Sequence, residues 1–348
     1  MLSDARSRQR LTVVAALLLG MVLGAAALRL SGMGAADDGA RLAEGDTTTP
    51  TQWTMSSLNV LGAGHTKPGG KKAGWASGPV RMKWLTEVIN EKGVDVIGLQ
   101  EFERPQYLVW EREMGADWDT YPGTAWGPKY MRNSVAWRTD QWSLVSGSWV
   151  KIPYFHGHLL KMPVVRLQNV TTGQEIYASS FHNPASVHGP AAQWRKRATD
   201  IQIAMVNRLR EESGLPVYVL GDMNERDVYY CRMTAATDMV AASGGYNNGT
   251  GGLSGCGPTR PTYIDWIFGS PETTFSGYVA ERGPKVRKST DHSMIIAEAE
   301  LPPVTPPTDC PTPTVTPTVT PTPSPTSTPR PSSSGTPTPN VPSPTTKP

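Results

Sequence analysis

Carboxylate, amide and imidazole side chains stand at the ends of apolar runs in this chain. Asp222 and Asn224 follow PVYVL in the stretch GDMNER, and Glu101 ends the run VDVIGLQE. The other residues of this kind are Asn59 in SLNVL, His182 in FHNPA, Asp265 in YIDWIF, and Asp291 with His292 in STDHS. A rigid sheet presents the side chains at its strand ends to a shared crevice, so the pattern predicts one polar site.

These side-chain types suit a divalent cation and a phosphate. Oxygen ligands without cysteine select a hard cation, Mg²⁺, Mn²⁺ or Ca²⁺, over zinc or copper. Imidazoles beside such a cation suit proton transfer or the binding of a developing phosphoryl charge. Taken singly, Asn59 could instead cap a turn, and Glu101 could begin a helix. Asp265 is harder to explain in that way, because a carboxylate in an apolar strand needs a partner, for which His292 is the candidate.

Apolar runs and helical patterns alternate through the middle of the chain. The runs predict strands over 53–61, 94–101, 133–138, 142–150, 162–170, 175–183, 217–222, 262–270 and 293–301. Helical spacing predicts a helix over 80–93, which buries Trp84 among others, and a second over 191–212. Two β-α-β passages with antiparallel strands between them predict an α/β fold of packed sheets with helices outside.

The start of the chain differs in composition from its middle. Arg6, Arg8 and Arg10 precede residues 11–28, which carry no charge, and this pattern predicts export. The run is short for a bilayer span and long for the core of a cleaved signal, so residues 1–30 are either a signal peptide or a membrane anchor. In both cases the bulk of the chain is predicted to be extracellular, secreted or held at the outer face of the cytoplasmic membrane.

The rest of the chain divides by composition into three parts. After a linker over 31–51, residues 52–301 are long enough for one large domain with a well-buried core. Residues 302–348 are almost only Pro, Thr and Ser, so we predict a disordered, semi-rigid tail. The formal net charge of +3 is too small to indicate a polyanionic partner and does not oppose one.

The chain has three cysteines. An oxidising compartment favours a disulfide between Cys231 and Cys256, with Cys310 of the tail left over. Two buried thiols are the alternative, because a disulfide also requires Cα atoms within about 7 Å of each other. Neither a CxxC pair nor a Cys/His ligand spacing occurs in the sequence, which argues against zinc.

Six motifs, in this order, resemble the endonuclease/exonuclease/phosphatase superfamily, whose fold is also called deoxyribonuclease I-like. They are SLNVL, GLQE, FHNPA, GDMNER, YIDWIF and STDHSMI, and they extend over nearly all of 53–301. One such motif would be a weak signal, whereas six in order are a strong one. The resemblance implies a four-layer α-β-β-α sandwich and metal-dependent hydrolysis of phosphate esters.

The resemblance also implies which residues bind metal and how the cysteines are arranged. Glu101 resembles the principal Mg²⁺ ligand of the family, with Asn59 beside it and Asp291 near the metal. Mg²⁺ is therefore the expected cofactor, with Mn²⁺ or Ca²⁺ as alternatives. Cys231 and Cys256 are placed much like a bridge of the secreted nucleases in this superfamily.

The implied catalytic residues are histidines, carboxylates and an amide. His292 resembles the essential histidine, oriented by Asp265, and His182 resembles a second histidine that faces the phosphate. Asp222 and Asn224 resemble the pair that positions or activates the attacking water and holds the phosphate. The family's assignments of the general base differ between members, so the base is left open.

One departure and two basic residues bear on the substrate. Secreted nucleases of the superfamily have an acidic residue before the strand that corresponds to NSVAWR, where this chain reads KYMRNSVAW. Arg132 occupies that neighbourhood, so His182 is expected to be held differently, and a strict deoxyribonuclease assignment loses support. Arg132 and Lys288, the latter in KVRKSTDH, are candidates for contacts with a substrate phosphate. His65 and His188 are interpreted as solvated or substrate-rim residues.

The predicted function is hydrolysis of a phosphodiester by an exported enzyme with one or two divalent cations. Nucleic acid is slightly favoured as the substrate because basic residues flank the site. A membrane-associated, sphingomyelinase-like phospholipid hydrolase and a hydrolase of small phosphomonoesters are alternatives on the same fold. A non-catalytic binding module displayed at the cell surface is the alternative from another class. No protein partner is evident, and a monomer is expected.

Overall fold

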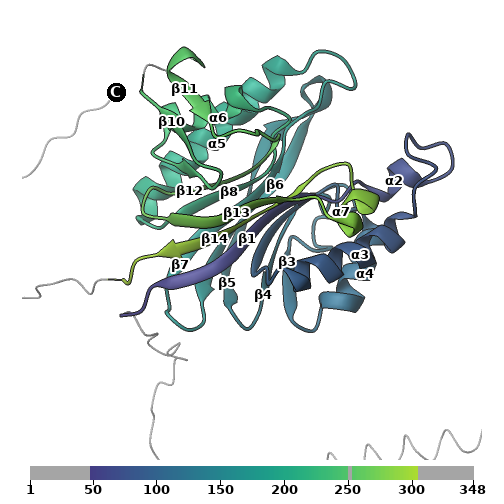
Figure 1. Cartoon of the computed structure of the whole chain (residues 1–348), viewed down its shortest axis with the longest axis horizontal. Coiled ribbons are helices and arrows are strands. Elements are labelled where there is room, and N and C mark those ends of the chain that lie inside the picture. The colour runs from purple at the N-terminus through teal and green to yellow at the C-terminus, as the bar shows by residue number, and fades with distance from the viewer. Residues whose placement is uncertain (1–47, 250–252, 305–348) are drawn as a thin grey trace, which may run out of the picture. The chain divides into compact units, whose positions relative to one another are not determined.

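A computed structural model describes residues 48–249 and 253–304 (Figure 1). The predicted signal peptide or anchor over 1–30, most of the linker over 31–51 and nearly all of the tail over 302–348 lie outside these residues. In the part that is described, no helix has the length and apolar character needed to cross a membrane.

The first sheet has six strands in the order β13-β14-β1-β2-β4-β3. They are β1 (Thr51–Asn59), β2 (Val96–Gln100), β3 (Trp118–Tyr121), β4 (Ser134–Arg138), β13 (Thr274–Glu281) and β14 (Met294–Leu301). β1 and β2 are parallel, with Asn59 opposite Gln100, and the other neighbours are antiparallel. The parallel pair brings the carboxyl ends of β1 and β2 to the same edge.

The second sheet also has six strands, in the order β5-β6-β7-β8-β12-β9. They are β5 (Trp142–Pro153), β6 (Leu159–Asn169), β7 (Glu175–His182), β8 (Val217–Asp222), β9 (Val240–Ala241) and β12 (Asp265–Gly269). β7 and β8 are parallel, with His182 opposite Asp222, while Asp265 of the antiparallel β12 faces Asp222 from the other side. This register places three predicted site residues in one row.

The two sheets pack face to face, and helices cover their outer faces (Figure 1). Between the sheets lie apolar side chains from both, where the rings of Trp142 and Tyr218 meet Trp53 edge to face at 5.3 and 5.4 Å. The first sheet is covered by α3 (Gly78–Glu91), α4 (Arg104–Met114) and α7 (Pro284–Ser289), and the second by α5 (Ala192–Ser213) and α6 (Asp227–Ala236). The predicted four-layer α-β-β-α sandwich is therefore confirmed.

The helices form where apolar residues recur at helical spacing. In α3, Met82, Leu85, Val88 and Ile89 are buried against the first sheet. The expectation that Trp84 is buried with them is wrong, because Trp84 lies at the side of this stripe and is only half-buried. Its ring instead lies 4.0 Å from Lys288 Nζ, measured to the ring centroid.

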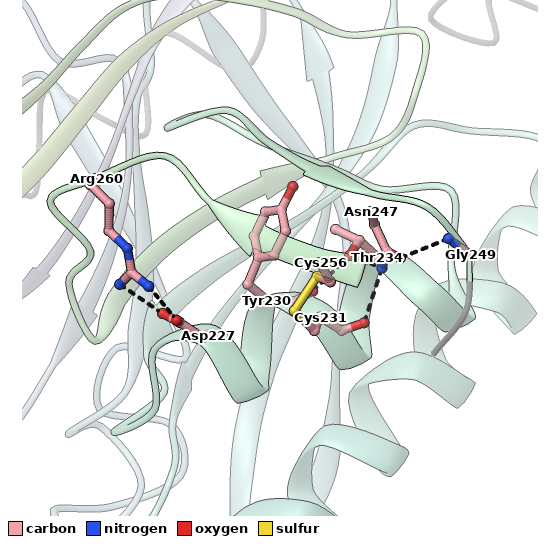
Figure 2. Close-up of a disulfide and its surroundings, with 8 residues drawn as sticks. All are labelled: Asp227, Tyr230, Cys231, Thr234, Asn247, Gly249, Cys256 and Arg260. Atoms are coloured by element: carbon pink, nitrogen blue, oxygen red, sulfur yellow. Dashed lines mark hydrogen bonds and ion pairs between the residues drawn. A yellow bond between two sulfur atoms is a disulfide. The ribbon is translucent and has the colours of Figure 1, made fainter. Parts of the chain in front are cut away.

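Cys231 of α6 and Cys256 of β11 (Cys256–Pro258) form a disulfide with Cα atoms 5.7 Å apart (Figure 2). β11 pairs with β10 (Gly245–Asn247), and Asn247 Nδ2 donates to Thr234 Oγ1 of α6 at 2.7 Å. The disulfide and this hydrogen bond attach the two-stranded ribbon to α6. The remaining short elements are α2 (Ala63–Thr66) and the 3₁₀ turns η1 (Phe155–Gly157) and η2 (Leu253–Gly255).

Candidate active site

Asp222, at the end of β8, lies at the centre of the candidate site. Its carboxylate is buried, and Oδ1 accepts a hydrogen bond from the backbone N–H of Asn224 at 2.9 Å. Asp222 Oδ2 accepts a second from Asn59 Nδ2 at 3.2 Å. The Nε2 atoms of two imidazoles approach the same oxygen, His182 at 3.4 Å and His292 at 3.7 Å. Side chains from both sheets therefore converge on one carboxylate.

His292, just before β14, is held from behind by Asp265. The Nδ1 atom of His292 lies 2.9 Å from Asp265 Oδ2, and the carboxylate is almost fully buried. Burial lowers the pKa of His292, but the carboxylates of Asp265 and Asp222 outweigh it and raise this pKa to about 10. Burial raises the pKa of Asp265 to about 6 despite the nearby imidazole. At neutral pH the pair is therefore an imidazolium held by a carboxylate, with Nε2 toward Asp222.

Glu101, directly after β2, has a φ of 55°, which is uncommon for a residue other than glycine. Its Oε2 atom accepts a hydrogen bond from the backbone N–H of Gly62 at 2.8 Å and lies 3.1 Å from His65 Nε2. Burial favours the neutral acid, but the hydrogen bond from His65, the charge of His182 and the hydrogen bond from Gly62 together outweigh it and hold the pKa of Glu101 well below its usual range. Leu61 and Asn224 also have positive φ values, 54° and 50°. Unfavourable backbone conformations thus collect around the site, as is common at functional sites.

Asp291 faces the same side of the site as Glu101. Its Oδ2 atom lies 3.4 Å from Lys72 Nζ. The pKa of His65 is raised chiefly by the hydrogen bond that His65 donates to Glu101, and the charge of Asp291 adds to this effect. The residue before it, Thr290, donates its hydroxyl to the carbonyl of Asn59 at 2.6 Å. The structure thereby brings the three predicted metal ligands, Asn59, Glu101 and Asp291, into one neighbourhood.

The other two predicted catalytic residues are anchored by their neighbours. Asn224 Nδ2 donates to the carbonyl of Asn183 at 2.8 Å. His182 is buried, and the hydroxyl of Tyr154 lies 3.4 Å from its Nδ1. Burial, followed by the charges of Glu101 and Asp222, raises the pKa of Tyr154 far above its usual value, so the phenol is neutral. The tyrosine hydroxyl thus contacts one ring nitrogen of His182, while the other ring nitrogen lies 3.4 Å from Asp222 Oδ2.

The two predicted phosphate contacts occupy different positions. Arg132 is exposed, and its Nη2 atom lies 3.3 Å from Glu103 Oε1, two residues beyond Glu101. Its backbone carbonyl accepts a hydrogen bond from the N–H of Phe102 at 2.9 Å, which ties this loop to the Glu101 segment. Lys288 extends over Trp84 on α3. Of these two residues, Arg132 is therefore the one that a backbone hydrogen bond places next to the Glu101 segment.

Arg81 holds two segments of the candidate site together, and it was not predicted from the sequence. It is fully buried on α3, and its guanidinium donates to the carbonyls of Val60 at 2.9 Å, Leu61 at 2.6 Å and Ser289 at 2.6 Å. One side chain thus joins the segment after Asn59 to the segment before His292. Because these contacts go to backbone carbonyls, the residue types in the sequence carry no signal for them.

His65, Tyr154 and Asn183 were also not assigned these roles from the sequence. His65 has 41% of its side chain exposed, in agreement with its interpretation as a solvated or rim residue, and its ring also faces Glu101. The position of His65 six residues after Asn59 was a usable signal, since this segment must start at the site. Tyr154 lies beyond a long hairpin, and no motif marks it.

The carboxylates of this site fit a divalent cation chemically. Glu101 and Asp291 are both partly exposed, with side-chain exposures of 23% and 39%, and the groups that face them are an imidazole and an ammonium. Two carboxylates and an amide are hard oxygen donors. A second set, Asp222, Asp265 and His292, offers ligand atoms that all lie within 4.8 Å of one another.

The four-layer sandwich and the polar residues at its strand ends indicate a hydrolase of phosphate esters. Comparison with known proteins supports this conclusion. Residues 56–292 match the model of the Endonuclease/Exonuclease/phosphatase family. The chain belongs to this family, whose members hydrolyse phosphate esters and generally use divalent metals. No curated protein matches the chain by sequence.

Solved structures share the fold at low sequence identity. A Bacteroides thetaiotaomicron family member is 16% identical, with 73% of this chain and 99% of that chain covered and a TM-score of 0.54. The mannosyl-6-phosphatase of the same organism is 15% identical, with 71% and 98% covered and a TM-score of 0.51. D. rerio TDP2 in complex with a single-strand DNA product is 15% identical, with 72% and 99% covered and a TM-score of 0.50. All three share the fold, although one of them is a mannosyl-6-phosphatase and another was solved with a DNA product.

Proposed function

We propose that this protein is an exported, divalent-cation-dependent phosphodiesterase, with nucleic acid as the first substrate class. The observation that carries the proposal is the environment of Asp222, whose Oδ2 atom is approached by Asn59, His182 and His292 within 3.2 to 3.7 Å. Such a carboxylate beside a charged imidazole suits hydrolysis, which needs a proton acceptor for water and positive charge near the phosphoryl oxygens.

Hydrolysis adds water across a P–O bond, and the residues can be given roles from their positions. Asp222, held by the N–H of Asn224 and by Asn59, accepts the proton of the attacking water. His292, kept charged by Asp265, directs its Nε2–H toward the phosphoryl group and neutralises charge as the bond breaks. His182 is placed by Tyr154 to donate a hydrogen bond to the same group. The leaving oxygen takes up a proton, so that the overall reaction consumes one water.

A cation would be held by Glu101, Asn59 and Asp291. When bound there, it supplies positive charge that polarises the phosphoryl oxygens. We assign the metal to this set rather than to Asp222, Asp265 and His292, because both oxygens of Asp265 lie within 3.0 Å of His292 Nδ1 and a charged imidazole has no lone pair to offer a metal.

Export and the phosphodiester preference form the finer part of the proposal. The uncharged run over 11–28 behind three arginines supports export, and a disulfide between Cys231 and Cys256 suits an oxidising compartment. Lys72 and Arg132 near the carboxylates favour an anionic substrate.

The test compares the protein with Asp222→Asn and His292→Ala on a substrate panel in Mg²⁺. The panel holds bis(p-nitrophenyl) phosphate, p-nitrophenyl phosphate, single-stranded DNA, RNA and sphingomyelin. We expect turnover of the diesters and a loss of at least about 100-fold in kcat in each variant. His158→Ala removes an exposed histidine of a neighbouring loop and is the matched control, expected to keep the wild-type rate. Wild-type rates in both site variants would contradict the proposal. Turnover of the monoester alone, or of sphingomyelin alone, would replace nucleic acid as the proposed substrate class.

A further inference from the structure

The segment that carries β5 and β6 is depleted in acidic residues. Between residues 120 and 174 the sequence has Asp140 as its only carboxylate. Asp140 pairs with Arg138 at 2.6 Å, at the end of β4 that lies opposite the candidate site. At the end near the site, the charged side chains of this segment are Lys129, Arg132, Lys151 and Lys161. This arrangement leaves one side of the site mouth positively charged.

The three lysines in this group lie against aromatic rings. Lys161 Nζ is 4.5 Å from the ring centroid of Trp149, 5.2 Å from that of Trp126 and 5.7 Å from that of Tyr130. Lys151 lies 5.4 Å from Trp149. Lys129 lies 5.3 Å from Tyr130. We call these six side chains the lysine–aromatic platform, and in the described part of the chain none of its lysines forms an ion pair with a carboxylate.

The platform is held rigidly on the hairpin. A Cβ atom at Gly147 of β5 would come within 2.2 Å of the ring of Tyr121, so this glycine allows β3 to press against β5. The ring of Tyr121 in turn meets Trp126 edge to face at 5.1 Å. Two strands and the loop between β3 and β4 therefore fix the rings in place, and such preorganisation reduces the entropy lost on binding.

The platform adjoins the candidate site through two connections. Lys151 is paired with Lys161 across the hairpin and stands three residues before Tyr154, a separation of about 10 Å along an extended strand. Tyr154 contacts His182 at 3.4 Å. On the other side, Tyr130 is two residues from Arg132, whose carbonyl holds the segment after Glu101. A polymer whose phosphate lies at Asp222 would have its neighbouring residues over the platform.

We infer that the lysine–aromatic platform binds single-stranded nucleic acid next to the reacting phosphate. Alternating rings and ammonium groups match alternating bases and phosphates, because unpaired bases stack on aromatic faces while lysines neutralise the backbone. Trp149 has 43% of its surface exposed for such stacking. An anionic membrane is the other polyanion to consider, but only Trp149 of the three rings is exposed while Trp126 and Tyr130 are half-buried, so the platform offers little apolar surface for insertion among lipid chains. This inference rests on the proposed function for its substrate and extends it to the polymer.

The test measures binding of a fluorescent single-stranded oligonucleotide by anisotropy, with the full protein in EDTA at several salt concentrations. We expect Lys151→Gln/Lys161→Gln to flatten the plot of log affinity against log salt by about 1.4, since each phosphate contact on a single strand contributes about 0.7. Trp149→Ala should weaken binding by about 10-fold. Lys83→Gln/Lys196→Gln, which changes two exposed lysines on α3 and α5, is the charge-matched control and should leave both quantities unchanged.

Two further measurements separate the possible outcomes. Turnover of bis(p-nitrophenyl) phosphate should be the same in all these variants, because the small diester does not reach the platform. Failure of the wild type to hydrolyse this diester would overturn the proposed function, while the oligonucleotide titration still tests the platform. Wild-type oligonucleotide binding in the platform variants would overturn the inference. The inference would equally be overturned if those variants kept oligonucleotide binding and lost only their binding to phosphatidylserine vesicles.

Discussion

Arg81 offers a direct test of how the fold positions the site. Besides the carbonyls of Val60, Leu61 and Ser289, its Nε donates to the carbonyl of Ala76 at 3.0 Å. Burial lowers the pKa of Arg81 to about 10, so the guanidinium stays charged at neutral pH although no carboxylate pairs with it directly in the described structure. Replacing it by methionine keeps much of the volume and removes every donor.

The expected loss follows from which carbonyls have a second donor. Gln106 Nε2 also donates to the carbonyls of Val60 and Leu61, at 3.2 Å each, so those two keep a partner. Ala76 and Ser289 lose the donor that Arg81 supplies, at about 1–3 kcal/mol each, so we expect Arg81→Met to destabilise the fold by about 2–6 kcal/mol. For a domain of this size that corresponds to a fall in Tm of about 4–24 °C.

The assay is thermal unfolding followed by circular dichroism, with diesterase turnover measured well below the transition. Arg81→Lys keeps the charge but not the planar fork, so it should fall between the wild type and Arg81→Met. Arg112→Met removes an exposed arginine that, among the residues the structure describes, pairs with its neighbour Glu113 alone, and this variant should stay within about 0.5 kcal/mol of the wild type. An Arg81→Met protein that melts within about 2 °C of the wild type, with unchanged kcat, would refute this reasoning.

Three further predictions concern the dyad, the disulfide and the metal ligands. Because the pKa of His292 is raised to about 10, its contribution to stability is complete below about pH 6.5 and is lost as the pH rises through about 10. Asp265→Asn should move this loss to lower pH, and an NMR titration of the ring in EDTA that gives the wild-type pKa would contradict the dyad. Cys231→Ser/Cys256→Ser should lower the free energy of unfolding by about 3 kcal/mol, given the sequence separation of 25 residues, and an unchanged urea midpoint would count against this. Glu101→Gln should raise the Mg²⁺ concentration for half-maximal activity by at least about 10-fold, with His158→Ala unchanged in the same titration.

The parts of the fold that the sequence predicts are those with a strong repeating pattern. The strands before Glu101 and up to Asp222 are apolar runs buried on both faces, the strand that ends at Asn59 is buried over its second half, and α3 and α5 carry long apolar stripes. β13 (Thr274–Glu281) was not predicted because it is an edge strand with a register shift, and its side chains are exposed or half-buried. α6 (Asp227–Ala236) escaped because it is short and its apolar residues follow no clear stripe.

The residues of the candidate site also fall into those that the sequence predicts and those that it does not. Residues at strand ends could be found because a polar group after an apolar run is conspicuous, and sheet register then brings His182, Asp222 and Asp265 side by side. Contacts that depend on three-dimensional packing could not be found, such as Arg81 on backbone carbonyls or Tyr154 on His182. These contacts join segments that are far apart in the chain, and no spacing in the sequence encodes them.

The central claim is that the Asp222–His292 pair hydrolyses a phosphodiester and that this activity requires a divalent cation, which Glu101 would hold. Its most direct test measures turnover of bis(p-nitrophenyl) phosphate by the metal-stripped protein as Mg²⁺ is added back, with His292→Ala as the parallel sample. The account predicts no turnover in EDTA, saturable recovery with Mg²⁺ in the wild type, and no recovery in His292→Ala at any Mg²⁺ concentration. Turnover that persists in EDTA, or full recovery in His292→Ala, would contradict it.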